Sequence, residues 1–200
     1  MRGQGPYLWI NKYAPPAGFH RVPPGGMCIG VFLFVRRGRR LLLGKVRDHP
    51  AWLELAGEEP SRVRADAGRW KLPARQLRLG EDPRDAARQI GEDILGLKGL
   101  RYGEPRVEVE FWKLGDQASG PPARRKLFHF DMWLLVDATL PSKVDVRPPA
   151  WFSQLSWQDP DSIPEKGWAR FHDDVVARWK RRRPPPGRAK RQRRAPIARG

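Results

Sequence analysis

The sequence contains a single cysteine, Cys28, among its 200 residues, and this scarcity removes two common kinds of site. One thiol cannot form an intrachain disulfide, and a metal site built from several cysteines is excluded for the same reason. Long apolar runs are also missing: the longest, 27–35, covers about nine residues, whereas a helix needs roughly 20 to cross a bilayer. Residues 1–10 lack the apolar core of a secretion signal. We therefore expect a cytoplasmic chain, or a nuclear one in a nucleated cell, with no membrane partner.

Acidic residues are outnumbered by basic ones, 22 against 39, and the excess lies at one end. Residues 178–200 hold eleven Lys or Arg and no acid, so removing those eleven from the net charge of +17 leaves +6. We expect 179–200 to be a disordered basic tail that contacts RNA or another polyanion by neutralising phosphates. Targeting, such as a nuclear address, is the alternative. The expected nucleic-acid-binding residues are Lys180, Arg181, Arg182, Arg183, Lys190, Arg191, Arg193 and Arg194.

Apolar residues are plentiful, at 40% of the chain with nine tryptophans and eight phenylalanines, which is enough material for one core. Residues 1–26 contain five prolines and five glycines and are expected to form an extended arm. Trp9, Ile10 and their neighbours either dock this arm onto the domain or leave it free. The folded domain is expected over 27–178.

The pattern within 27–178 predicts alternating strands and helices. Asp82 and Pro83 are typical of a helix start, and Ile90 and Ile94 follow on one face at helical spacing. The expected elements are a hairpin over 27–46, a loop over 47–69, an extended piece over 70–79, a helix over 82–95, strands over 107–111, 126–136 and 151–157, and a helix over 167–179. In 107–111, valines alternate with glutamates, as in a half-buried strand. This order favours an α/β or α+β sandwich.

One segment relates the chain to a known family. Trp70-Lys71-Leu72-Pro73 leads into Gly80-Glu81-Asp82-Pro83, which opens a helix that ends near Gly96. This order resembles the Nudix hydrolase superfamily, whose signature is Gly-x5-Glu-x7-Arg-Glu-U-x-Glu-Glu-x-Gly-U, with U apolar. The flanking strands also suit the family, so the likeness covers about three-quarters of the chain. It implies a mixed β-sheet sandwiched between α-helices, with the signature as a loop–helix–loop.

The family chemistry depends on glutamates that share one helix face and hold hard divalent cations through oxygen. The metal neutralises a diphosphate and activates water, and the arginine orients a carboxylate through an ion pair. The resemblance therefore implies hydrolysis, dependent on Mg²⁺ or Mn²⁺, of a nucleoside diphosphate linked to another group. A nucleotide-type small molecule is the expected ligand. The alternative is a catalytically silent Nudix-fold protein that binds RNA or a ribonucleoprotein through the basic tail.

Two alignments with the signature are open. Without gaps it runs over 75–97, and isoleucines, Ile90 and Ile94, fall at two glutamate positions. The second alignment shortens the first spacer by one residue and restores that residue before Gly96. We prefer the second because it buries Ile90 and places Arg88 and Glu92 four residues apart on the outer face.

In the second alignment Arg88 takes the arginine position and Gln89 the first glutamate, while Glu92 and Asp93 form the acidic pair. Gln89 has no charge, and Ala74-Arg75 stand where the family has two glycines. The expected catalytic residues are Arg88, Glu92 and Asp93; the expected metal ligands are Glu81, Glu92 and Asp93; the expected substrate-binding residues are Arg75 and Trp70.

Several other residues are open to two interpretations each. His129 and Asp131 share a strand face and either contact a ligand or pair within the strand. A glutamate of the 47–69 loop, Glu54, Glu58 or Glu59, could supply an outside carboxylate. The tryptophans Trp70, Trp112, Trp133 and Trp157 are either core residues or platforms for base stacking.

Overall fold

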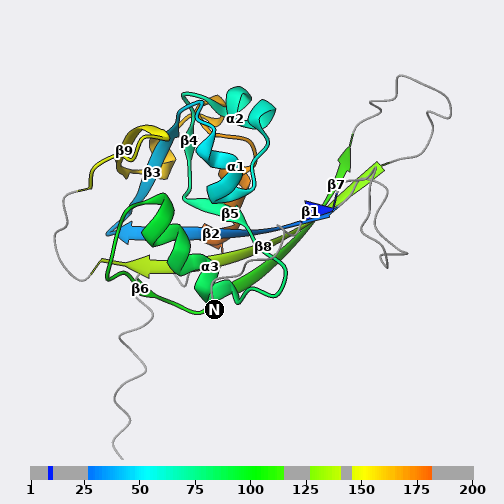
Figure 1. The fold of residues 1–200 in the computed structure, drawn as a ribbon, viewed down its shortest axis with the longest axis horizontal. Coiled ribbons are helices and arrows are strands. Elements are labelled where there is room, and N and C mark those ends of the chain that lie inside the picture. The colour runs from blue at the N-terminus through cyan, green and yellow to red at the C-terminus, as the bar shows by residue number, and fades with distance from the viewer. Residues whose placement is uncertain (1–8, 11–26, 115–126, 141–145, 182–200) are drawn as a thin grey trace, which may run out of the picture.

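The computed structural model describes residues 9–10, 27–114, 127–140 and 146–181 (Figure 1). Nine strands in this part form one sheet, with the order β4-β3-β2-β8-β6 along its main path. β1 and β5 also pair with β2, β7 pairs with β8, and β9 pairs with β3. The strands are β1 (Trp9–Ile10), β2 (Met27–Arg37), β3 (Arg40–Val46), β4 (Trp70–Lys71), β5 (Ala74–Gln76), β6 (Arg101–Tyr102), β7 (Arg106–Leu114), β8 (Leu127–Thr139) and β9 (Phe152–Gln158). β2 and β8 run parallel whereas the other pairs are antiparallel, so the sheet is mixed.

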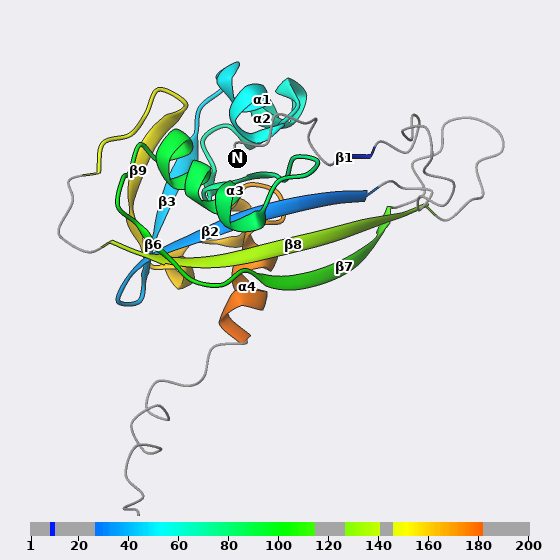
Figure 2. The same cartoon turned by 60° about the horizontal axis from the view of Figure 1, so that its bottom comes forward.

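Helices cover both faces of this sheet. The α-helices are α1 (Ala51–Ala56), α2 (Pro60–Asp66), α3 (Pro83–Gln89) and α4 (His172–Arg181); α3 continues as the π-helical turn η1 (Ile90–Ile94), and η2 (Pro160–Ser162) and η3 (Glu165–Gly167) are short 3-10 turns. Figure 2 shows α1, α2 and α3 on one side of the sheet and α4 on the other. The expected mixed sheet between helices is confirmed.

The central strand β2 separates two hydrophobic cores because its side chains alternate between the two faces. Val31, Leu33 and Val35 face the core beneath α1, α2 and α3, which includes Ile90 and Ile94. On the opposite face, Phe34 packs in the core beneath α4, and its ring stacks on Trp179 at 4.7 Å between centroids. Burial on both faces explains why 27–35 is a continuous apolar run rather than an alternating one.

The expected hairpin over 27–46 is confirmed, and its turn is Gly38-Arg39, with Gly38 at φ 62°. The expected loop over 47–69 is wrong, because α1 and α2 lie there. Each helix is so short that it buries one pair of side chains, Trp52 with Ala56 and Val63 with Asp66, which gives no periodic pattern.

The strand expected at 107–111 is present, but its faces are reversed from the pattern of its side chains. Val107 and Val109 are 51% and 44% exposed, whereas Glu108 is buried. Glu110 forms an ion pair with Arg178 of α4, which turns the glutamate face toward that helix.

The closing helix begins at His172, five residues later than expected, and continues to Arg181. Trp168 and Ala169, shortly before the helix, stay extended. Trp168 forms an isolated β-bridge with Trp70, and the Ala169 N–H donates to the Trp70 carbonyl at 2.8 Å. Trp179 is only 2% exposed, so the folded domain includes residues that the sequence assigned to the tail.

At the other end, Trp9 and Ile10 pair with Cys28 and Met27, which docks this part of the expected arm onto the sheet. The rest of 1–26 lies outside the described residues. Within the described part, no helix combines the length and apolar character needed to span a membrane.

Candidate functional site

The loop–helix–loop over 74–97 is built by β5, the turn after it, α3 and η1. β5 pairs with β2 so that Arg75 lies opposite Val31, on the sheet face that α3 covers. The chain then turns at Gly80, whose φ of 75° suits glycine, and α3 begins at Asp82. The Asp82 carboxylate accepts the Arg84 N–H at 2.7 Å, and Pro83 is the first helical residue. The helix start expected from the sequence is confirmed.

A buried polar cluster links the lead-in strand to this helix. The Arg75 guanidinium forms an ion pair with the Glu81 carboxylate, and the two side chains are 2% and 0% exposed. The same guanidinium donates to the Gln89 side-chain oxygen at 3.2 Å and to the Gln76 carbonyl at 3.0 Å. The second oxygen of Glu81 accepts the Arg78 N–H at 3.0 Å. Protein donors therefore satisfy both oxygens of Glu81.

This cluster changes the roles expected for two residues. Arg75, expected at the substrate, points beneath the helix toward Glu81 and Gln89. Glu81, expected among the metal ligands, is buried and neutralised by that guanidinium. The signature arginine orients a carboxylate in the family, and here a guanidinium from the strand before the helix makes the pair.

The second half of the helix widens into a π-helical turn over Ile90–Ile94. A π-turn accommodates one more residue than an α-helical turn. Ile90 and Ile94 are fully buried, which agrees with the alignment that restores a residue before Gly96 and gives Ile90 an apolar position. Glu92 and Asp93 are both exposed at the outer side of this turn.

Arg88 does not pair with Glu92 as the four-residue spacing predicted. Its guanidinium binds the Asp85 carboxylate at 2.6 Å, three residues earlier. The prediction assumed regular α-helical geometry, and the π-turn that begins at Ile90 rotates the following residues out of that register.

Gly91 lies where the helix approaches β6, a contact that the sequence did not indicate. A Cβ at Gly91 would stand 2.3 Å from the Tyr102 hydroxyl oxygen and 2.8 Å from Leu100 Cδ1. Burial, with the nearby Glu92 carboxylate, raises the pKa of Tyr102 to about 12. Tyr102 is thus a neutral hydroxyl beside Glu92 at neutral pH.

The donor set does not fit a divalent cation. Among the described residues, no group of three or more His, Cys, Asp or Glu side chains is arranged to hold a metal. Mg²⁺ and Mn²⁺ prefer several oxygen ligands with negative charge. In the signature segment Glu81 is held by Arg75, Asp85 is held by Arg88, and Gln89 is an uncharged amide. Glu92 and Asp93 remain as adjacent surface carboxylates.

Trp70, the other residue expected at the substrate, lies on the opposite face of the sheet from the signature helix. It packs against the α4 core, and the Lys45 ammonium stands 5.0 Å from its ring centroid. The structure therefore does not bring Trp70 and Arg75 together: side chains on neighbouring short strands face different cores.

A second buried polar group lies between β4 and the α1–α2 segment. Lys71, 2% exposed, forms an ion pair with Glu58 and stands 4.8 Å from the Trp52 ring centroid. Burial lowers the pKa of Lys71 despite Glu58. His172 Nδ1 accepts the Leu72 N–H at 3.1 Å, and burial, with Lys71 nearby, holds its pKa well below its usual range. Glu58 is thus a buried ion-pair partner rather than an outside carboxylate.

The remaining predicted site residues are Asp131, His129 and the basic residues of the C-terminal end. Asp131 accepts a hydrogen bond from the Cys28 thiol, and burial, with the Asp131 charge, raises the pKa of that thiol. The side chain of His129 lies outside the described residues, as do Arg182, Arg183, Lys190, Arg191, Arg193 and Arg194 of the tail. Lys180 and Arg181 belong to the last turn of α4.

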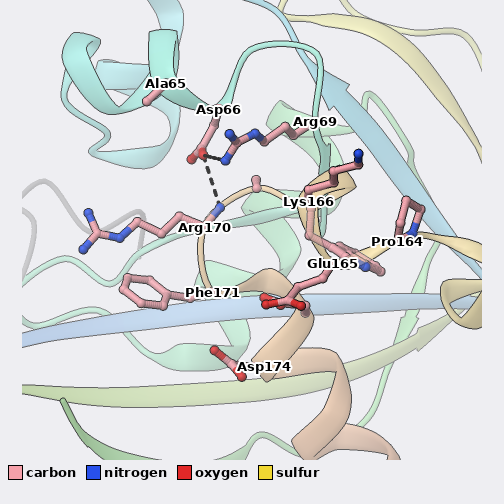
Figure 3. Close-up of a pocket in the computed structure, with 12 residues that line it drawn as sticks. Ala65, Asp66, Arg69, Pro164, Glu165, Lys166, Arg170, Phe171 and Asp174 are labelled. Carbon is pink, nitrogen blue, oxygen red and sulfur yellow. Dashed lines mark hydrogen bonds and ion pairs between the residues drawn. The ribbon is translucent and has the colours of Figure 1, made fainter.

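A hollow of about 800 Å³ lies between α2 and the segment before α4 (Figure 3). Asp66 holds its rim together, since its carboxylate accepts the Arg170 N–H at 3.1 Å and faces Arg69. Phe171 has a left-handed φ of 69°, with the Arg170 guanidinium 4.7 Å from its ring centroid. No residue of the signature helix lines this hollow, so it is separate from the loop–helix–loop.

Comparison with solved structures identifies the architecture. The chain has the Nudix fold: it matches a MutT protein from Methanosarcina mazei Go1 with a TM-score of 0.51 and 17% identity, over 80% of this chain and 96% of that one. A MutT Nudix hydrolase from Burkholderia pseudomallei matches at a TM-score of 0.47 and 16% identity, over 76% of this chain and 96% of that one.

The Nudix domain of Shewanella oneidensis NrtR, solved with ADP ribose, matches at a TM-score of 0.47 and 14% identity, over 84% of this chain and 93% of that one. No protein-family model and no curated protein matches the sequence. At these identities the likeness shows the fold.

Proposed function

We propose that this Nudix-fold domain is a binding protein that does not hydrolyse nucleotides through a metal. The observation that carries the proposal is the buried cluster of Arg75, Glu81 and Gln89. In the preferred alignment the amide of Gln89 stands where the family has a glutamate, and the Arg75 guanidinium, from a position where the family has glycine, lies beside it. Since the guanidinium neutralises Glu81 and Gln89 carries no charge, the cluster offers no net negative charge to a divalent ion.

The second candidate function is metal-dependent hydrolysis, and it depends on Glu92 and Asp93. Under this hypothesis the two carboxylates hold Mg²⁺ or Mn²⁺ and Arg88 positions them. Two charges together with substrate phosphates are the least that such a site could use. The adjacent positions and the exposure of Glu92 and Asp93 argue against a compact metal site.

The test is a hydrolysis panel of nucleoside diphosphate derivatives, including ADP ribose, with Mg²⁺ or Mn²⁺. We expect the rate with the protein to equal the rate with metal alone, and Glu92→Gln to leave it unchanged. Glu104→Gln is the matched control because Glu104 is also an exposed carboxylate. Divalent-dependent turnover that Glu92→Gln abolishes and Glu104→Gln preserves would establish the hydrolase instead.

The proposed ligand is a polyanion, namely nucleic acid. Residues 182–200 contain eight Lys or Arg and no acid, and they follow directly on α4. Binding by such a segment falls steeply with salt because phosphate contacts release counterions. We expect the full chain to bind a 20-nucleotide oligouridylate more tightly, and with a steeper salt dependence, than residues 1–181 do. Equal affinities and slopes would rule out this role for the tail. The cut must follow Arg181, because Trp179 is part of the core.

A further inference from the structure

The turn between β2 and β3 carries three exposed arginines at one end of the sheet. Arg37, Arg39 and Arg40 surround Gly38 and line a hollow of about 560 Å³ together with Trp157 and Asp159. Figure 2 shows this turn, in blue, at the lower left of the view, where β2 ends and β3 begins. The hollow lies apart from the signature helix and from the hollow beside α4.

The register of the hairpin places two of these charges against each other. Arg37 and Arg40 are direct cross-strand partners. Like charges at such positions destabilise an antiparallel pair. No ion pair with a carboxylate in the described part of the chain relieves Arg37, Arg39 or Arg40, so the turn retains its positive charge. Repulsion of this kind is relieved when an anion binds between the two cations.

Trp157 supplies a flat surface in the same hollow. It is half-buried on β9 beside Leu42, and the Arg37 guanidinium lies 4.3 Å from its ring centroid. A planar cation stacked on an aromatic ring is a surface on which nucleobases also stack, while its N–H groups remain available to phosphate. The hollow therefore offers both charge and stacking.

The nearby acidic groups are already bound. Asp137 accepts the Trp179 indole N–H at 3.0 Å and pairs with Arg36 at 3.2 Å. Asp159 accepts the backbone N–H of Asp161 at 3.0 Å, and Asp161 in turn pairs with Lys180. Asp137 and Asp161 are neutralised by these cations, and the three arginines outnumber Asp159, so the hollow has a net positive charge.

The Asp161–Lys180 pair also shows that the last turn of α4 reaches the same end of the sheet as the hollow. Asp159 lines the hollow and Asp161 follows two residues later. Arg181 ends the helix, and the basic segment 182–200 continues from there. The last described turn of α4 thus lies at the same end of the domain as the hairpin arginines.

We propose that Arg37, Arg39, Arg40 and Trp157 form an interface for single-stranded nucleic acid on the folded domain. This inference rests on the polyanion binding proposed above and assigns it a surface on the domain. The bound strand places phosphates at Arg39 and Arg40 and stacks bases against the Arg37–Trp157 pair. Since the contacts are with phosphates and base faces, binding is expected to depend weakly on sequence.

The experiment measures fluorescence anisotropy of labelled 20-nucleotide oligouridylate and oligothymidylate against the full chain over a range of salt. We expect Arg39→Ala/Arg40→Ala to weaken binding by about 25-fold at 0.1 M salt and to reduce the salt slope by about 1.4, from roughly 0.7 per phosphate contact on a single strand. Arg37→Lys keeps the charge but loses the planar stack, so we expect a smaller loss.

The control is Arg64→Ala/Lys98→Ala, which removes the same charge from exposed positions elsewhere. Thermal unfolding checks the fold: removing Arg40 relieves the repulsion with Arg37, so the melting temperature should not fall.

A loss of affinity in the hairpin variant with little change in the control supports the inference. Equal effects of the two variants, or tighter binding to phosphatidylglycerol vesicles than to either oligonucleotide, overturn it. If the tail truncation lowers affinity and the hairpin variant does not, the proposed function stands and the proposed hairpin interface is wrong. If the full chain binds neither oligonucleotide, the proposed function and the hairpin interface both fail.

Discussion

Replacing Arg75 by methionine tests whether the cluster beneath the signature helix is an essential structural element. The change keeps an unbranched side chain about as long as the alkyl stem of arginine and removes the charge, so Glu81 is left as a buried carboxylate. Both side chains are almost completely excluded from water, at 2% and 0% exposure. Removing one partner of a buried ion pair costs about 3–5 kcal/mol because the other charge is left uncompensated. For a chain of this size that corresponds to a fall in melting temperature of roughly 6–20 °C.

The assay is urea and thermal unfolding followed by circular dichroism, with Arg75→Met/Glu81→Gln as the matched control. The double variant removes both charges and keeps an acceptor for the Arg78 N–H, so we expect it to recover most of the lost stability. Arg84→Met, at an exposed ion pair with Glu104, should leave the stability nearly unchanged because solvent screens the pair. A loss below about 1 kcal/mol for Arg75→Met, or a double variant no more stable than the single one, would refute the buried charge pair.

Two further predictions concern residues that the signature pattern did not indicate. Gly91→Ala should destabilise the fold by about 1–3 kcal/mol, since its Cβ would meet the Tyr102 hydroxyl at 2.3 Å. Gly91→Ala/Tyr102→Phe should recover part of the lost stability in the same unfolding assay. If it recovers none, the clash lies elsewhere. His172 is buried with a pKa well below 6.5, so the unfolded chain takes up a proton that the folded chain does not. The free energy of unfolding should therefore fall as the pH drops below about 6.5, by up to about 1.4 kcal/mol per pH unit. His172→Asn should flatten that slope. Equal slopes for the two proteins from pH 7 to 5 would exclude the effect.

Much of the fold could be predicted from the sequence because its strongest signals are local. The run over 27–35, the turn at Gly38 and the Asp82-Pro83 helix start are each specified by adjacent residues. The missed elements depend on distant partners. α1 and α2 are too short to show a period, and the extended stretch before α4 exists because Trp168 pairs with Trp70, about a hundred positions away.

The candidate site was less predictable for a similar reason. Spacing alone placed Arg88 and Glu92 on one face, and this assumed an unbroken α-helix. The π-turn changed that geometry, and Arg88 instead bound Asp85. Arg75 could be recognised as a departure from the family pattern, but only the pairing of β5 with β2 shows that its guanidinium points toward Glu81.

The residues that depart from the family signature also stabilise the segment. Glu81 is fully buried, and without the metal-site charges of the family it would be an isolated carboxylate, which is costly. Arg75 supplies the compensating charge from a position where the family has glycine, and Gln89 accepts a hydrogen bond from the same guanidinium. Reverting one of these residues alone would leave a buried charge or donor without its partner. The cluster therefore acts as a unit, and restoring a metal site would require changing Arg75 and Gln89 together.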